Sequence, residues 1–160
     1  MIIYYYGTGK GKTTAGLGAL VRAKAYNKKI LLIQSLKNNP VESKLFNGFC
    51  FGDSSFINKT PEKKHYSFAQ DAFDFFKEQK GKYDVIMFDE LSILLHYGLL
   101  DVEQVVESLS EFVGPEYPVL IITGRYKIKG LEEVADIVTE MKEKKHIYKK
   151  GIKALKGIDY

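Results

Sequence analysis

The chain has 160 residues, the length of one ordinary domain. Hydrophobic residues make up 45% and charged residues 28%, which excludes a largely disordered chain, and no apolar run is long enough for a transmembrane helix. A single cysteine, Cys50, excludes an internal disulfide and a multi-cysteine zinc site. Because the first residues do not resemble a secretory signal, we expect a cytoplasmic protein with one domain over residues 1–160.

The charge balance is mildly basic. There are 24 Lys and Arg against 20 Asp and Glu, for a net charge of +4. This excess suits an anionic ligand such as a nucleotide and is smaller than is typical of a nucleic-acid-binding protein. Residues 142–156 hold seven lysines. We interpret them as a solvated tail, with contact to phosphate or nucleic acid as the alternative.

In the first half of the chain, short apolar strands alternate with a helical pattern. The predicted elements are a strand over residues 2–6, a helix over 12–26 and a strand over 29–34. Residues 38–64 lack clear periodicity and are predicted to form a long functional or mobile loop. Ser67 followed by Gln70 resembles a capping box, which predicts that a helix begins there and continues through Phe76.

The second half continues the alternation. The predicted elements are a strand over residues 84–88, a helix over 101–113, a strand over 118–122, a short helix over 131–135 and brief strands over 136–141 and 146–148. Strands that alternate with helices indicate a mostly parallel sheet with helices on both faces. The predicted fold class is therefore α/β.

A glycine-rich loop lies where the first predicted strand gives way to the first helix. It reads Gly7-Thr8-Gly9-Lys10-Gly11-Lys12-Thr13-Thr14. Glycines let the backbone turn sharply and direct successive N–H groups into one cavity, which binds phosphate together with the positive end of the helix. Lys12 adds a full charge for the outer phosphates, and the Thr13 hydroxyl is placed to bind Mg²⁺. We predict that residues 7–14 bind the phosphates of a nucleoside triphosphate.

The spacing of this loop is unusual. Three residues separate Gly7 from Gly11, where the common phosphate loop has four. The tighter loop predicts that the phosphate chain is held in an unusual position or direction. For Lys10, contact with phosphate and exposure to water are equally good interpretations.

Charged residues follow two later strands. Asp89 and Glu90 come directly after one strand, and Arg125 follows another. Ligands of parallel sheets bind at the carboxyl ends of strands, so these side chains should lie beside the loop. We predict that Asp89 and Glu90 bind Mg²⁺ and that Arg125 contacts phosphate or substrate, with helix capping as the alternative for the two acids. The residues thus predict a Mg–nucleoside triphosphate protein, and not yet a reaction.

The loop and several later motifs together resemble the P-loop cob(I)alamin, or corrinoid, adenosyltransferases. The matching segments are residues 7–15, Arg22-Ala23, Asp89-Glu90-Leu91, Tyr97-Gly98, Thr123-Gly124-Arg125, Ala135-Asp136, residues 138–141, Lys145-His146, residues 151–154 and Gly157-Ile158. The resemblance covers about two-thirds of the chain. It implies a RecA-like P-loop fold, a homodimer and a flavoprotein reductase as the source of electrons.

The resemblance also implies the chemistry. A reduced Co(I) corrinoid would attack the 5′ carbon of ATP, forming the cobalt–carbon bond and releasing triphosphate. Because Co(I) has no proton to lose, no general base is needed, and the protein would position the substrates and neutralise the leaving charge. Lys12 and Glu90 are the residues predicted to be catalytic, with Mg²⁺ as the metal. The family is thought to bind ATP reversed relative to other P-loop proteins, in accord with the short loop.

The sequence differs from the family's pattern at positions that the resemblance assigns to corrinoid binding rather than to ATP binding. The family commonly has an N-terminal extension over the corrinoid, whereas this chain starts at the first predicted strand. Where the family reads Gln-Phe with a nearby Lys-Gly, this chain has residues 34–38, Gln-Ser-Leu-Lys-Asn. The family's corrinoid-facing Phe and Trp correspond to residues 52–57, and the chain has no tryptophan. Phe56 is the predicted aromatic contact, with a core position as the alternative.

Two other functions remain open from the sequence alone. One is a P-loop ATPase or nucleoside kinase, in which Glu90 would orient water; Cys50 alone cannot supply the zinc site of thymidine-kinase-like enzymes. The other is an ATP-dependent nucleic-acid-binding module that uses Lys149, Lys150 and Lys153. We expect neither a membrane nor a nucleic acid as a partner.

Overall fold

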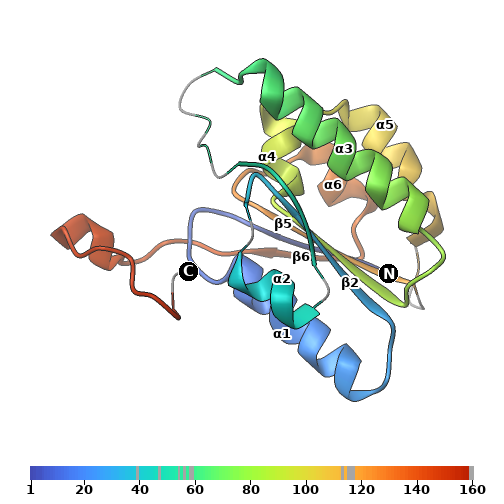
Figure 1. Ribbon diagram of the computed structural model, residues 1–160, viewed down its shortest axis with the longest axis horizontal. Helices are drawn as coiled ribbons and strands as arrows, with labels where there is room; N and C mark the ends of the chain where they lie inside the picture. Colours follow the sequence, from blue (N-terminus) through green and yellow to red (C-terminus); the bar gives the residue numbers. More distant parts are fainter. Residues whose placement is uncertain are drawn as a thin grey trace.

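A six-stranded parallel sheet with helices on both faces forms the body of the protein (Figure 1). The computed structural model describes residues 1–38, 40–46, 48–53, 55, 57, 60–112, 114 and 118–158. The strand order is β3-β2-β4-β5-β1-β6, and every adjacent pair is parallel. This topology confirms the predicted α/β class and the parallel sheet.

The strands are short and mostly buried. They are β1 Ile2–Tyr6, β2 Ile30–Ser35, β3 Phe49–Phe51, β4 Val85–Asp89, β5 Val119–Gly124 and β6 Ile137–Glu140. Every residue of β4 and β5 is buried, whereas β6 at the sheet edge is exposed. Central parallel strands are covered on both faces, which is why β4 and β5 are apolar runs without alternation.

Helices cover the sheet unequally. They are α1 Lys12–Ala25, α2 Val41–Phe46, α3 Lys63–Gln79, α4 Leu91–His96, α5 Val102–Ser108 and α6 Lys129–Val134, with 3-10 turns at Ser110–Phe112 and Ile147–Lys150. Figure 1 shows α1 and α2 on one face and α3 to α6 on the other. Alternate residues of a strand point to opposite faces, so Met87 joins the core under α1 while Phe88 joins the larger core under α3.

Several predicted elements are wrong in detail. The predicted loop over residues 38–64 contains α2 and β3. Helix α3 begins at Lys63 rather than near Ser67, because Glu62 and His65 form the capping box. The predicted strand at residues 146–148 is part of a 3-10 turn, in which the Tyr148 N–H donates to His146 Nδ1 at 3.1 Å. Helix α4 has no counterpart among the predicted elements.

The predicted cap at Asp101 is confirmed, because its carboxylate accepts a hydrogen bond from the Gln104 N–H at 2.9 Å. That helix, α5, ends at Ser108, earlier than predicted. After β6 the chain leaves the sheet as an arm formed by residues 142–158, which projects from the body (Figure 1). Tyr148 and Leu155 in this arm are exposed. None of the described helices is long and apolar enough to cross a membrane.

Candidate functional site

The glycine-rich loop joins β1 to α1 and is braced by the end of β6. The Gly9 N–H donates to the Met141 carbonyl oxygen at 2.7 Å, and the Met141 N–H donates to the Tyr6 carbonyl oxygen at 2.7 Å. A Cβ on Gly9 would lie 2.8 Å from the Met141 carbonyl oxygen, so only glycine permits this approach. Gly11 has a φ of 108°, in the left-handed region that favours glycine.

Lys12 folds back over the loop. Its Nζ donates to the Gly9 carbonyl oxygen at 2.7 Å. Burial lowers the pKa of the Lys12 ammonium, although the negative charge of Glu90 opposes this shift. The side chain is thus a charged group held at the loop by one hydrogen bond.

Three other residues of the loop lie at the protein surface. Thr8, Lys10 and Thr14 are exposed. The Thr8 hydroxyl oxygen accepts a hydrogen bond from the Glu143 N–H at 3.4 Å, so the start of the C-terminal arm lies against the loop. The exposed positions leave these three side chains accessible to a ligand that enters from solvent.

Asp89 is the most strongly hydrogen-bonded carboxylate of the site, and it is fully buried at the end of β4. Its Oδ1 accepts from the Thr13 hydroxyl at 2.9 Å and from the Thr123 hydroxyl at 2.6 Å. Its Oδ2 accepts from Lys37 Nζ at 2.5 Å and from Gln34 Nε2 at 3.3 Å. Burial acts to lower the pKa of the Lys37 ammonium, but the contact with Asp89 outweighs it and the pKa is raised.

Glu90 is placed differently from its neighbour. Its backbone is left-handed, with a φ of 66°, and its N–H donates to the Thr123 hydroxyl oxygen at 3.0 Å. Among the described residues no partner reaches its buried Oε2. Burial, together with the negative charge of Asp89, raises the pKa of Glu90 to about 7. A buried carboxylate oxygen without a partner is a natural contact for a ligand or a bound cation.

Arg125 follows β5 and is exposed. Its charge acts on the pKa values of Lys12 and Glu90, so it lies within electrostatic reach of both. The preceding Gly124 lies so close to Ser92 of α4 that a Cβ there would meet the serine side chain. This contact fixes the direction in which the chain leaves β5.

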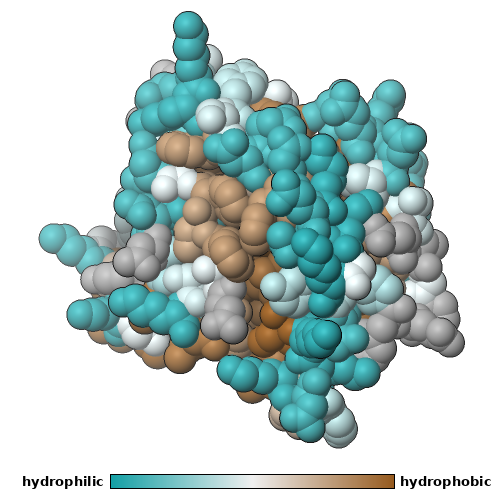
Figure 2. Space-filling view, turned by 45° about the vertical axis from the view of Figure 1, so that its right-hand side comes forward, coloured by the Kyte–Doolittle hydropathy of each residue, from teal (hydrophilic) through white to brown (hydrophobic). Residues whose placement is uncertain are grey.

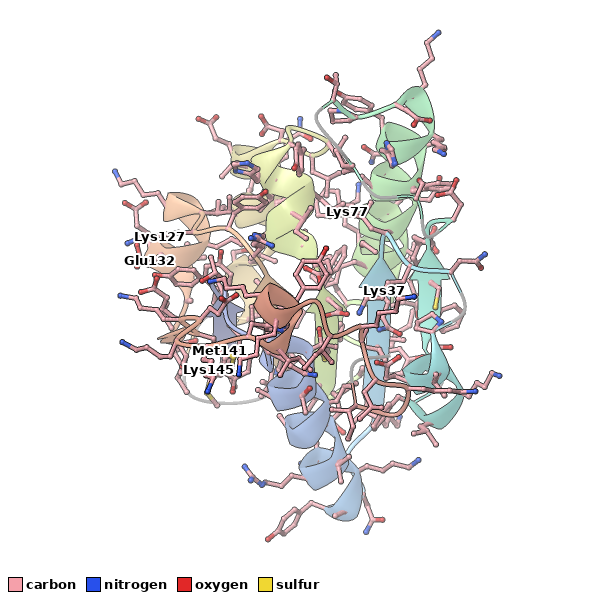
Figure 3. All side chains as sticks on the ribbon, turned by 90° about the vertical axis from the view of Figure 1, so that its left-hand side faces the viewer. Lys37, Lys77, Lys127, Glu132, Met141 and Lys145 are labelled. Carbon is pink, nitrogen blue, oxygen red and sulfur yellow. The ribbon has the colours of Figure 1, made fainter. Side chains whose placement is uncertain are left out.

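The structure therefore brings the predicted loop, Asp89, Glu90 and Arg125 to one edge of the sheet, the carboxyl ends of the strands. Figure 3 looks onto this edge, with Lys37 two residues beyond the end of β2. Phe56, the predicted corrinoid contact, lies outside the described residues. Sequence reasoning did not assign Lys37, Gln34 or Thr123 to the site. The sequence did offer a signal for them, because each lies near the carboxyl end of a predicted strand. Gln34 and Thr123 lie near the ends of β2 and β5, and Lys37 lies just beyond β2.

Oxygen atoms at this edge suit a hard cation. Mg²⁺ is usually held by one or two carboxylates, with waters and substrate phosphates completing its octahedron. Asp89 and the Thr13 hydroxyl, 2.9 Å apart, fit that set, and Glu90 adds an oxygen that has no partner among the described residues. In the part of the chain that the structure describes, no three His, Cys, Asp or Glu side chains gather as a metal site. Asp89, Thr13 and Glu90 therefore fit a Mg²⁺ ion that nucleotide phosphates also hold.

A concavity lies at the opposite edge of the sheet, at the amino ends of the strands. It has a volume of about 450 Å³, and Met1, Ile3, Tyr26 and Val119 are among its lining residues. Figure 2 turns this side toward the viewer and shows hydrophobic surface gathered between hydrophilic residues. No acid is among the described residues that line this cavity.

Comparison with known proteins decides between the functions that this geometry permits. A family model described as ATP:corrinoid adenosyltransferase BtuR/CobO/CobP matches residues 1–160. The chain belongs to this family. A corrinoid adenosyltransferase from Sinorhizobium sp is 31% identical over 172 residues, which cover 100% of this chain and 80% of that protein. One from Escherichia coli strain K12 is 32% identical over 169 residues, covering 100% and 85%.

Membership of the ATP:corrinoid adenosyltransferase family confirms the resemblance predicted from the loop and the C-terminal motifs. Among solved structures, a DNA replication initiation factor gives a TM-score of 0.45 at 15% identity, covering 88% of this chain and 39% of that one. A likeness of that size carries no argument about function.

Proposed function

We propose that this protein transfers the 5′-deoxyadenosyl group of ATP to the Co(I) of a reduced corrinoid, giving an adenosylcobalamin-type product and triphosphate. The family match along residues 1–160 carries the proposal, because the site geometry alone fits any Mg–nucleoside triphosphate protein. No observation favours the ATPase, the nucleoside kinase or the nucleic-acid-binding module over it.

The proposed reaction makes limited demands on the protein. An electron pair of Co(I) attacks C5′ of ATP, the Co–C bond forms, and the C5′–O bond breaks with its electrons leaving on the triphosphate. No proton moves, so the protein has to align the two substrates and stabilise the negative charge that departs. Positive groups at the carboxyl edge support this role, namely Lys12 and Arg125.

We assign roles to the predicted residues on the same basis. Residues 7–14 bind the phosphate chain, with Lys12 moving from the Gly9 carbonyl oxygen to phosphate oxygen. Asp89, Thr13 and Glu90 would hold Mg²⁺, directly or through water, and the bound ion would neutralise charge on the triphosphate. Lys12 and Glu90 are the proposed catalytic residues. Arg125 contacts phosphate or substrate.

The remaining proposals extend the family assignment. They are a single P-loop domain over residues 1–160, a homodimer, a cytoplasmic location, a flavoprotein reductase that supplies electrons, and a corrinoid contact at Phe56. The family resemblance supports the homodimer, the reductase and the Phe56 contact, whereas the length and composition of the chain support the single domain and the cytoplasmic location. Gel filtration with light scattering tests the homodimer. A Phe56→Ala variant tests the corrinoid contact: its activity with Co(II) plus reductant should fall more than its activity with Co(I), and equal losses would refute the contact.

The deciding experiment mixes the protein with Mg–ATP and chemically reduced cob(I)alamin under anaerobic conditions. We expect a light-sensitive adenosylcobalamin spectrum and an equal amount of triphosphate. Lys12→Ala should abolish the transfer, whereas Lys77→Ala, which removes an exposed lysine on α3, should leave it unchanged. ADP and inorganic phosphate as the products would instead establish an ATPase, and full activity of Lys12→Ala would refute the role of the loop.

A further inference from the structure

Lys37 lies just beyond β2, outside the phosphate loop, and its side chain contacts the Asp89 carboxylate. Its Nζ lies 2.5 Å from Oδ2 of Asp89, whose side chain is fully buried. The Lys37 side chain is itself 29% exposed, so it reaches a buried carboxylate from the open side of the site. An ammonium group therefore binds the same carboxylate that is proposed to hold Mg²⁺.

The backbone beside Lys37 is built to make this contact. Leu36 has a φ of 58°, a left-handed conformation that is unfavourable for leucine. Its N–H donates to the Phe51 carbonyl oxygen at 2.8 Å. A Cβ on Gly52 would lie 2.7 Å from the Lys37 backbone nitrogen, so a glycine is needed where β3 ends. Strained backbone that the surrounding structure maintains commonly marks a functional position.

The four donors to Asp89 are not equivalent. Gln34 and Thr123 lie on strands of the sheet, and Thr13 lies in the first turn of α1. Lys37 has the full charge and the long flexible stem. A divalent cation bound at the Thr13–Asp89 pair would repel the ammonium at short range. Lys37 is therefore the donor that such a cation displaces.

We propose that Lys37 exchanges partners during nucleotide binding: its ammonium pairs with Asp89 when no nucleotide is bound, and it moves to a phosphate oxygen of the triphosphate once Asp89 is engaged by Mg²⁺. The identity of the ligand as ATP rests on the proposed function. The exchange keeps a buried carboxylate paired with a cation in both states, since an unpaired buried charge is strongly destabilising. It also supplies a second mobile cation, beside Lys12, for the charge of the leaving triphosphate.

Two binding measurements on the purified protein test the exchange. The first is binding of Mn²⁺ alone, followed by electron paramagnetic resonance. Lys37→Ala and Lys37→Met should each bind Mn²⁺ at least tenfold more tightly than the unaltered protein, because the competing ammonium is gone. The second is calorimetric binding of Mg–tripolyphosphate, which the same two variants should bind at least tenfold more weakly.

A matched control is Lys77→Ala. Lys77 is also a lysine in an ion pair, with Asp74 at 2.7 Å, but it lies on α3. Its removal should change neither affinity. Thermal unfolding of all variants, measured without ligand, shows whether each is folded, and Lys37→Met retains most of the stem if the alanine variant proves unstable.

Exchange predicts that the Lys37 variants bind Mn²⁺ more tightly and Mg–tripolyphosphate more weakly. A purely structural ion pair does not predict these opposite shifts. Mn²⁺ affinity that is unchanged or weaker in both Lys37 variants would overturn the proposal, and so would unchanged affinity for tripolyphosphate. The Mn²⁺ measurement uses neither ATP nor corrinoid, so it reports on Lys37 whatever reaction the protein catalyses. Both shifts without any adenosyl transfer would refute the proposed function and leave the exchange intact.

Discussion

Replacing Glu90 by glutamine should stabilise the ligand-free protein, and by more at pH 8 than at pH 5. Burial and the charge of Asp89 raise the pKa of Glu90 from 4.5 to about 7. Between these two values the folded protein binds more protons than the unfolded chain, so stability falls as the pH rises through this window. The raised pKa then lowers the stability of the folded protein by about 1 kcal/mol at pH 5 and about 3 kcal/mol at pH 8. Glutamine cannot ionise and escapes this cost.

Urea unfolding in the presence of a chelator, followed by circular dichroism at pH 5 and pH 8, measures the effect. We expect the difference in unfolding free energy between Glu90→Gln and the unaltered protein to grow by about 2–3 kcal/mol across this range. Glu133→Gln is the matched control, because Glu133 is an exposed residue of α6 whose ion pair with Lys129 spans 3.4 Å. A gain for Glu90→Gln that does not depend on pH would refute the reasoning that this carboxylate is forced toward its neutral form.

Three glycine substitutions test the packing around the loop and α1. Gly9→Ala should weaken ATP binding, measured by calorimetry, at least tenfold. The new Cβ would lie 2.8 Å from the Met141 carbonyl oxygen and would push the loop away from the end of β6. Unchanged affinity would show that the loop does not need this contact. Gly18→Ala should raise the unfolding free energy by up to about 1 kcal/mol, since a Cβ there meets nothing within 4 Å and alanine is the better helix former. Gly16→Ala should instead lower it by about 1 kcal/mol, because its Cβ would lie 2.6 Å from Met87 Cε in the core; equal urea midpoints for the two helix variants would contradict this.

The parts of the site that sequence reasoning located are those encoded by neighbouring residues. The loop is contiguous, and it stands between an apolar strand and a helical pattern, so its position at the strand end follows from local periodicity. Asp89 is the last residue of a wholly buried strand and Glu90 follows it, which placed them at the carboxyl edge of a parallel sheet.

Contacts between segments that are distant in the sequence could not be predicted from local patterns. Lys37 and Thr123 are separated from Asp89 by 52 and 34 positions, and they meet it because β2 and β5 are the two neighbours of β4. Alternating strands and helices predict a parallel sheet but do not fix the order of its strands. The start of α3 was misplaced for a different reason: a Glu62–His65 pair replaces the usual serine or threonine capping box.

Strand order also explains how the exchange at Lys37 can occur without rearranging the sheet. The strands on either side of β4 each supply a donor to a different oxygen of Asp89: Gln34 of β2 reaches Oδ2, and Thr123 of β5 reaches Oδ1. These two donors belong to the sheet and stay when Lys37 leaves. The carboxylate therefore keeps one hydrogen bond on each oxygen and its orientation toward Thr13. A cation that arrives with the nucleotide meets a ligand already in place, and the donor to Asp89 that must move is a flexible ammonium.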